Sequence, residues 1–404
     1  MSLRKFLMNV LLPFFFLIAS FELGISQFSA PVTTVSLTPI TVADTTPIAV
    51  PPAKEEFKPN GRVFGYAFGD FYYKSGGDTA TWASRAEYSG VPKDVNAFAL
   101  RRMYLGYEYN ISLVFSTLVM LEAQDVFQDT RGDRTVTIKS LYLSWKNIYK
   151  GTELRIGQIP TLSYALMSES IWFYRSIEKM IIDQRAIRSS SDLGVALIGV
   201  LNSAGTYGYN LMVGNGTGTR PEELTPVGKG KIYSAEVFGK FLDKKLMVEL
   251  YGDVQTGIDE KNQLLLKSLV GYKTEPLTIG VEVMHQTLYH NKSDATNAVP
   301  FGFSVFARGS LVKDKLGAFA RFDTFNPDLN YRAQDVPSVY NRSTMFQHYD
   351  EQFFVAGLDF TPHKKVHLMP NIWINSYSAK GESSILVERK ADIVPRVTFL
   401  FEYK

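Results

Sequence analysis

From Gly61 onward the chain divides into short strand-like segments, and the links that join them are long and short in turn. Within a segment, apolar residues tend to alternate with polar or small ones, which places the two sets on opposite faces of a β-strand. We count about 16 such segments, with ends defined to within about two to four residues. They lie near 61–73, 97–110, 112–124, 135–147, 152–158, 192–201, 207–215, 231–241, 246–256, 263–273, 277–288, 300–311, 316–325, 351–360, 366–376 and 392–403.

The links alternate in length along the whole of this region. The mostly long links after odd-numbered segments are 74–96, 125–134, 159–191, 216–230, 257–262, 289–299, 326–350 and 377–391. The short links after even-numbered segments include 110–111, 202–205, 243–245, 274–276, 313–315 and 362–365. Tight periplasmic turns and large extracellular loops are typical of an all-β transmembrane antiparallel barrel, with both ends of the chain on the periplasmic side. A propeller would show a sequence repeat, and we find none.

Composition excludes several other classes of protein. Beyond the N-terminus no stretch approaches the roughly 20 apolar residues that a membrane-spanning helix needs. The 28 Phe and 22 Tyr residues favour β-structure. The absence of cysteine excludes disulfide scaffolds, thiolate metal sites and a lipoprotein anchor. A formal charge of +3 argues against a nucleic-acid partner.

The N-terminus predicts export from the cytoplasm. Arg4 and Lys5 precede a mostly apolar run over 6–20, and Gly24 and Ser26 offer a cleavage site of small residues. We therefore expect a signal peptide over 1–26. A membrane anchor is the alternative, although the run is short for one. Residues 27–59 are rich in Pro and Thr, which predicts an extended periplasmic tail before a barrel that spans 60–404.

The last predicted strand has two unlike faces. Ile393, Val397, Phe399, Phe401 and Tyr403 share one face. The other face holds Arg396, Thr398, Glu402 and Lys404, with Leu400 as its one apolar member. Charges on an inner face predict a water-filled interior rather than a packed core. The end of this strand also resembles the aromatic-tipped segment that outer-membrane assembly machinery selects, although Lys404 follows Tyr403.

The segment 160–191 is the longest link and combines apolar with charged residues. Because Trp172, Phe173 and Ile181 need shelter from water, we expect the loop to fold into the barrel and to narrow it. A cap packed outside the barrel is the alternative. If the loop folds inward, its charges would set the size and ion preference of the channel. The candidates for the constriction are Glu169, Arg175, Glu178, Lys179, Asp183, Arg185 and Arg188.

Alternation within two strands nominates further charges for the inner wall. These are Arg102 and Glu108 on the second strand and Arg321 and Asp323 on the thirteenth. Opposite charges across a channel would create a transverse field. The alternative is that these opposite charges pair with one another and stiffen the barrel wall.

Catalytic and metal-binding patterns are lacking. The five histidines, which are His285, His290, His348, His363 and His367, show no metal-ligand spacing such as H-E-x-x-H. The glycine-rich stretch 214–218 has no GK[ST] and no following helix, so it does not indicate a phosphate loop. We therefore expect no cofactor, no metal and no enzyme activity.

Several stretches resemble known proteins. Residues 157–160, 172–179 and 189–195 resemble porins of the Bacteroidetes group, as do 101–109, 321–327 and 366–373. The broader relatives are the phosphate-selective porins O and P. The resemblance implies a 16-stranded barrel with an inward-folded third loop, assembled as a homotrimer. Phosphate selectivity is not carried over, because the ladder of inward Arg and Lys residues in those porins does not align with this chain.

Two functions follow from these features. The first is a porin of the bacterial outer membrane, in contact with lipid bilayer and lipopolysaccharide, through which small hydrophilic solutes or ions diffuse. The second is a plugged barrel that acts as a surface-binding or adhesion protein.

Overall fold

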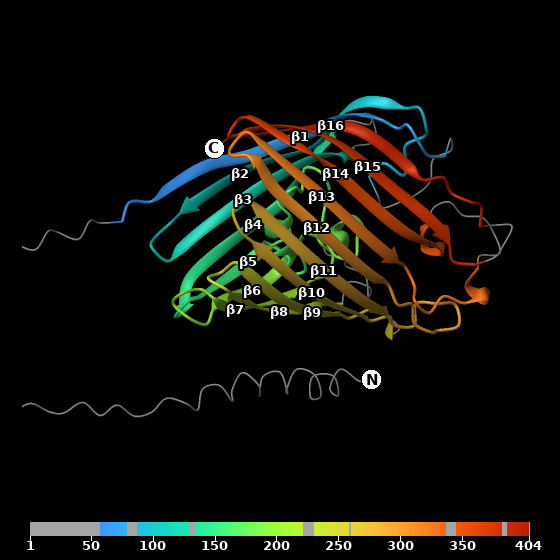
Figure 1. The fold of residues 1–404 in the computed structure, drawn as a ribbon. Coiled ribbons are helices and arrows are strands. Elements are labelled where there is room, and N and C mark those ends of the chain that lie inside the picture. The colour runs from blue at the N-terminus through green and yellow to red at the C-terminus, as the bar shows by residue number, and fades with distance from the viewer. Residues whose placement is uncertain are drawn as a thin grey trace, which may run out of the picture. The chain divides into compact units, whose positions relative to one another are not determined.

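A closed barrel of sixteen antiparallel strands forms the described part of the chain (Figure 1). The computed structural model describes residues 57–78, 87–128, 134–220, 230–257, 260–336, 345–381 and 386–403. Each strand pairs with its neighbours in sequence, and β1 pairs with β16 to close the barrel. Closure leaves no strand edge unpaired, which a sheet in a membrane requires.

The strands have the following bounds: β1 Asn60–Tyr73, β2 Asn96–Asn110, β3 Phe115–Gln128, β4 Arg134–Tyr149, β5 Thr152–Pro160, β6 Ser191–Val200, β7 Tyr207–Gly214, β8 Ile232–Phe241, β9 Leu246–Gln255, β10 Gln263–Lys273, β11 Leu277–Leu288, β12 Phe301–Val312, β13 Leu316–Asn326, β14 Tyr349–His363, β15 Val366–Ala379 and β16 Asp392–Tyr403. The described parts of the links contain four short helices: α3 Ser168–Trp172, α4 Ile181–Gln184, η4 Ala333–Asp335 and η5 Met345–His348.

The predicted fold class and all sixteen predicted strands are confirmed, with ends that differ by four residues or fewer. The alternation of short and long links is confirmed as well, since two residues join β4 to β5 and thirty join β5 to β6. The predicted signal peptide and most of the predicted tail lie outside the described residues, as does Lys404. No helix within the described ranges is both long and apolar enough to cross a membrane.

The barrel wall separates apolar from polar side chains. On β16, Val397 and Phe401 are 42% and 43% exposed on the outer face, whereas Arg396 and Thr398 are buried on the inner face. This is the division that the sequence predicts. Large apolar side chains are exposed on other strands in the same way, including Leu250 on β9 and Leu266 on β10. An apolar exterior with a polar interior is the pattern of a barrel in lipid.

Both ends of the barrel chain lie at the end with the short turns. Asn60 at the start of β1 pairs with Asn110, which is the last residue before the β2–β3 turn. Near the end of β16, the amide of Glu402 donates to the carbonyl of Lys365 in the β14–β15 turn. The long links, including the one that contains α3 and α4, therefore begin at the opposite end.

The interior is not uniformly polar, which differs from the prediction. The inner face contributes buried Met284, Phe306, Phe319, Phe353 and Trp373 to one apolar cluster. These side chains lie on β11 to β15, and residues of the β5–β6 link complete the cluster. The final strand alone could not indicate this, because its own inner face is polar. One side of the interior is therefore packed like a core.

Candidate functional site

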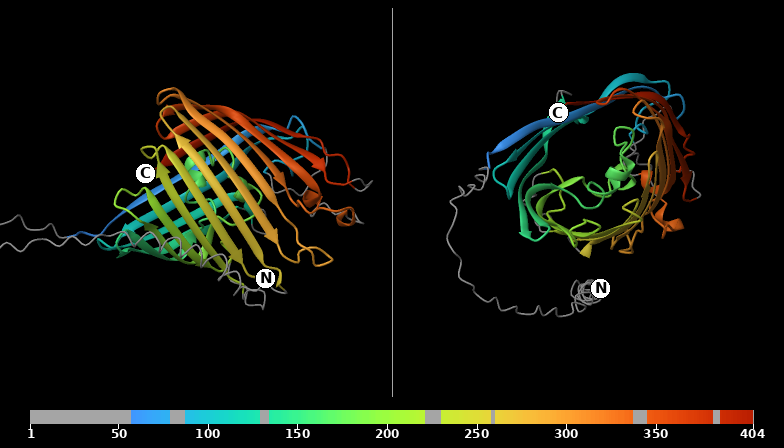
Figure 2. Two further views of the ribbon diagram at one scale, coloured as in Figure 1. Left: turned by 60° about the horizontal axis from the view of Figure 1, so that its bottom comes forward. Right: turned by 60° about the vertical axis from the view of Figure 1, so that its left-hand side comes forward.

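The link 161–190 between β5 and β6 lies inside the barrel (Figure 2). It contacts the inner wall on strands far from its own, because α3 approaches β11 and β12 and α4 approaches β12. We call residues 161–190 the inner loop. Pro160 and Ser191 at its two ends are direct register partners, so the loop leaves and returns to the wall at one point.

Trp172 is the main apolar anchor of the inner loop. Its side chain is fully buried, and its ring meets those of Phe306 and Phe319 edge-on at centroid distances of 5.4 and 6.3 Å. Its indole Nε1 donates to the carbonyl of Glu178 at 2.8 Å. Edge-to-face rings stabilise beyond the area that they bury. Ile181 is fully buried too, in keeping with the shelter expected for it.

Phe173 departs from that expectation, because its side chain is 61% exposed. Its backbone has a φ of 69°, in the left-handed region, where it ends helix α3. This turn directs the ring away from the apolar cluster that holds its neighbour Trp172. The guanidinium of Arg308 lies over the ring at 5.1 Å from its centroid, a cation–π contact.

Four arginines from four strands hold the backbone of the inner loop, and we call them the arginine cradle. Each donates a hydrogen bond to a loop carbonyl. Arg101 on β2 bonds Ser176 at 2.6 Å, Arg308 on β12 bonds Ile171 at 3.0 Å, Arg321 on β13 bonds Lys179 at 2.6 Å, and Arg396 on β16 bonds Ile177 at 2.6 Å. A buried carbonyl without a donor is costly, so these bonds allow irregular backbone to lie in the interior.

Carboxylates of the wall neutralise most of the cradle. Arg321 pairs with Asp323 through both nitrogens of its fork, with Nε at 2.8 Å, and both side chains are fully buried. Asp70 lies 3.4 Å from Arg101 and 3.5 Å from Arg396. Glu87, in the β1–β2 link, also pairs with Arg101. The cradle is therefore a structural device with little net charge to offer a passing ion.

Six of the seven predicted constriction charges are engaged in contacts. Arg175 pairs with Glu169 at 2.5 Å and with Asp183 at 2.8 Å, within the loop. Three others reach the wall. Glu178 accepts from Trp373 Nε1 at 2.8 Å, Arg185 pairs with Glu351, and Arg188 pairs with Asp253 at 2.7 Å. Lys179 is the exception, since no carboxylate of the described residues forms an ion pair with its ammonium, although its charge contributes to lowering the pKa of Asp183.

The remaining charges of the loop face a second group on β2, β3 and β4. There Glu122 lies 3.7 Å from Arg102 and 3.0 Å from Lys139, and Lys139 also donates to Ser190 Oγ of the loop at 2.6 Å. We call these side chains together the charged cluster. It comprises Arg102, Glu122, Lys139, Glu169, Arg175, Lys179 and Asp183.

The electrostatics of Asp183 show how these charges act on one another. Burial raises the pKa of the Asp183 carboxyl, but Arg175, Lys179, Arg102 and Lys139 more than reverse this effect. The pKa of Asp183 therefore lies below its ordinary value. Burial likewise disfavours the charged Arg175, yet Glu169 and Asp183 hold the pKa of its guanidinium above the usual range. Both groups stay ionised at neutral pH.

The four predicted wall charges have different surroundings. Arg321 and Asp323 pair with each other beneath the loop, which is the second of the two arrangements expected for them. Arg102 is part of the charged cluster. Glu108 pairs with the largely exposed Arg62 near the turn end, at 2.8 Å, far along the strand from Arg102.

The fold can be compared with those of known proteins. No model of a protein family matches this sequence, and a search of curated proteins finds no match. Among solved structures, the outer membrane channel DcaP of Acinetobacter baumannii matches with a TM-score of 0.61 and 11% identity, over 85% of this chain and 97% of that one. The fold is that of outer-membrane porins.

Two further outer-membrane proteins agree with this comparison. OmpT of Vibrio cholerae has a TM-score of 0.56 at 10% identity, over 87% of this chain and 99% of its own. The anion-selective porin from Comamonas acidovorans has a TM-score of 0.55 at 10% identity, over 86% of this chain and 100% of its own. Identities this low relate the chains by fold alone.

Sequence reasoning missed several residues of this porin-like interior. Arg101 is one, because strict alternation would direct it away from the side to which Arg102 points. A register shift between Phe68 and Asp70 of β1 lets both arginines turn inward. A bulge of this kind re-aims side chains locally. Arg308 was not singled out, and Arg396 was placed on the inner face without a partner, since both arginines bond carbonyls more than 130 residues away.

The described residues contain no group of three or more His, Asp or Glu side chains placed to hold a metal ion.

Proposed function

We propose that this chain is a bacterial outer-membrane porin through which small hydrophilic solutes or ions diffuse. One observation carries the proposal: a closed barrel with an apolar outer face holds a loop inside it, and charged side chains from loop and wall meet there. The similarity of its fold to outer-membrane channels supports this function.

The charged cluster is the proposed constriction. Several of its side chains are partly accessible, with exposed fractions of 17% for Arg175 and Asp183 and 14% for Lys139, whereas Arg102 and Glu122 are buried. It holds four cations and three carboxylates, which leaves one net positive charge. Because Lys179 has no ion-pair partner among the described residues, we assign that excess charge to it. A weak preference for anions follows.

The route to the membrane belongs to the same proposal. Residues 1–26 would direct export and be removed, 27–59 would lie in the periplasm, and 60–404 would be inserted by the outer-membrane assembly machinery into a bilayer with lipopolysaccharide. A homotrimer is the proposed assembly, supported by the trimer form of OmpT from Vibrio cholerae among the similar structures. A relation to Bacteroidetes porins and to the porin O and P family remains part of the proposal.

A plugged barrel used for surface binding is the second candidate. The observation that favours it is the number of strands to which the inner loop is tied by hydrogen bonds or ion pairs. These nine strands are β2, β4, β9, β10, β12, β13, β14, β15 and β16. A loop fixed so widely could close the interior.

A measurement of conductance distinguishes the porin from the plugged barrel. The refolded chain in a planar bilayer should give stepwise, ohmic currents if it is a porin. A protein that inserts, as judged by protease protection in vesicles, yet passes no current would exclude the porin and favour the plugged barrel.

A further inference from the structure

A cavity of about 440 Å³ lies at the end of the barrel where the long links begin. Its lining comes from the β11–β12 link, the β13–β14 link, the adjoining strand ends, and Arg185 and Ile187 of the inner loop. Small-molecule sites in proteins occupy roughly 300–1,000 Å³. The cavity is therefore large enough for a small molecule, on the order of one or two sugar rings.

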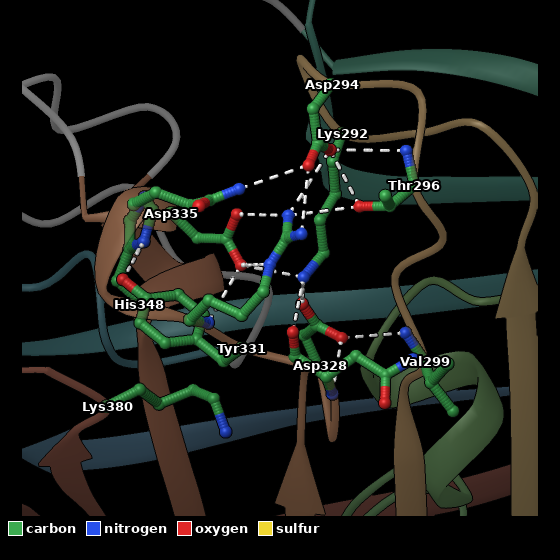
Figure 3. A network of polar contacts seen from close by, with 12 residues as sticks. Lys292, Asp294, Thr296, Val299, Asp328, Tyr331, Asp335, His348 and Lys380 are labelled. Atoms are coloured by element: carbon green, nitrogen blue, oxygen red, sulfur yellow. Dashed lines mark hydrogen bonds and ion pairs between the residues drawn. The ribbon is translucent and has the colours of Figure 1, made fainter.

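The loops around the cavity are tied together by a network of charges (Figure 3). Lys292 of the β11–β12 link reaches Asp328 at 2.6 Å and Asp335 at 2.7 Å, both in the β13–β14 link. In the other direction, Arg332 reaches Asp294 at 2.9 Å and also pairs with Asp335 at 3.0 Å. Two links that are far apart in sequence are thus joined by reciprocal ion pairs.

Further bonds extend this network. The carboxylate of Asp328 accepts from the backbone amides of Val299 and Asn330, each at 2.9 Å. Lys380, after β15, donates to Asn326 at 2.8 Å and pairs with Asp350 at 3.0 Å. The walls of the cavity are therefore preformed, which lowers the entropic cost of binding a ligand there.

The charged side chains in the lining already have partners. Lys292 pairs with Asp328 and with Asp335, Asp335 pairs also with Arg332, and Arg185 pairs with Glu351. An ionic ligand would have to displace one of these pairs and leave a charge buried and unpaired, at a cost of several kcal/mol. An uncharged ligand meets no such barrier.

The uncharged part of the lining suits hydroxyl groups. Gln286, Asn291, Gln334 and Gln347 carry amides, which both donate and accept hydrogen bonds, as a hydroxyl does. Beside them lie apolar surfaces that include Phe325, Phe346, Leu288 and Pro300. Apolar walls with a few amide groups match a molecule with polar edges and apolar faces.

From these observations we infer that the cavity binds a small, uncharged, polyhydroxylated solute of the size of a mono- or disaccharide. The inference deepens the proposed porin function, because it names a class of solute that binds at the loop end of the channel. The role of this site in uptake rests on that proposed function. Binding itself needs no conductance, so the two claims fail separately.

Ala298 offers the sharpest variant, because it lines the cavity and is only 8% exposed. Ala298→Trp should fill much of the space. Ala333→Trp is the matched control, since Ala333 lies exposed on η4 and is not part of the lining. Gln347→Ala, at an exposed lining residue, is a milder change that should weaken binding by about two- to tenfold through one lost hydrogen bond.

Calorimetric titration of the refolded full chain in detergent with glucose, maltose and glucose 6-phosphate tests the inference. Heat-modifiable migration on gels would show that each variant is folded. We expect saturable binding of a neutral sugar, weakened at least tenfold by Ala298→Trp and unchanged by Ala333→Trp. The inference is overturned if neither neutral sugar binds, if both tryptophan variants bind equally well, or if the phosphorylated sugar binds more tightly. Sugar binding by a barrel that passes no current would contradict the porin and leave this site standing.

Discussion

Lys179→Glu reverses the one charge of the inner loop that lacks an ion-pair partner among the described residues. The charged cluster of the wild-type protein holds four cations and three carboxylates. The variant holds three cations and four carboxylates, so the sign of the net charge changes while the ion pairs of the cluster among the described residues are kept. The carbonyl of residue 179 still accepts from Arg321, which keeps the arginine cradle intact.

The size of the expected change in ion selectivity follows from Coulomb's law. For an ion about 8 Å away in water, a change of two unit charges amounts to about 1 kcal/mol, and screening at 0.1 M salt roughly halves it. A shift of about 0.5 kcal/mol changes the permeability of each ion about twofold, in opposite directions for cation and anion. The ratio of anion to cation permeability should therefore fall about fivefold.

The reversal potential of a planar bilayer under a KCl gradient measures this ratio directly. Lys313→Glu makes the same charge change in the exposed β12–β13 turn and serves as the control. We expect the potential to change sign for Lys179→Glu and to move little for Lys313→Glu. An open Lys179→Glu channel with the wild-type reversal potential would refute the assignment, as would equal shifts in both variants.

Three further perturbations test other parts of the account. Arg321→Met leaves buried Asp323 without its partner and should lower the free energy of unfolding in vesicles by about 3–5 kcal/mol, whereas Arg321→Met/Asp323→Leu should recover most of the loss; a double variant as unstable as the single one would argue against an ion-pair role. Leu250→Arg puts a charge on the lipid face of β9 and should cost about 2–4 kcal/mol in urea titrations, while Leu329→Arg on an exposed link should cost less than about 0.5 kcal/mol; equal costs would mean that the outer face does not meet lipid. Because the pKa of Asp183 is lowered in the folded barrel, its contribution to stability is full above about pH 4 and is lost only as the pH falls below that value; ion selectivity should be constant from pH 7 to about 4, and a transition near pH 6 would contradict the assignment.

The wall of the barrel was predictable from sequence because its rules are local. A period of two along each strand and the alternation of link lengths require no knowledge of distant residues. Every strand was found for this reason, and Val397 and Arg396 face opposite sides as expected. The ends of β3 and β14 were harder, since pairing extends them into the links.

The interior was predictable only in part because its contacts are not local. The inner loop was identified as a special segment, but its partners could not be. Trp373 and Glu178 are 195 residues apart, and Arg396 and Ile177 are 219 apart. Of the seven charges nominated for a constriction, three tie the loop to the wall, namely Glu178, Arg185 and Arg188, whereas the other four belong to the charged cluster. Composition alone cannot distinguish a charge that pins a loop from one that faces an ion.

Single-channel conductance of the full chain and of a variant without the inner loop tests the central claim most directly. Since Pro160 and Ser191 are register partners, a short glycine-rich turn can replace residues 161–190 and leave β5 and β6 paired. The account predicts stepwise conductance for the full chain, and larger, less selective conductance for the variant. Current from the variant alone would show that the loop is a plug, and a full chain that inserts without conducting would contradict the proposal that this barrel is a porin.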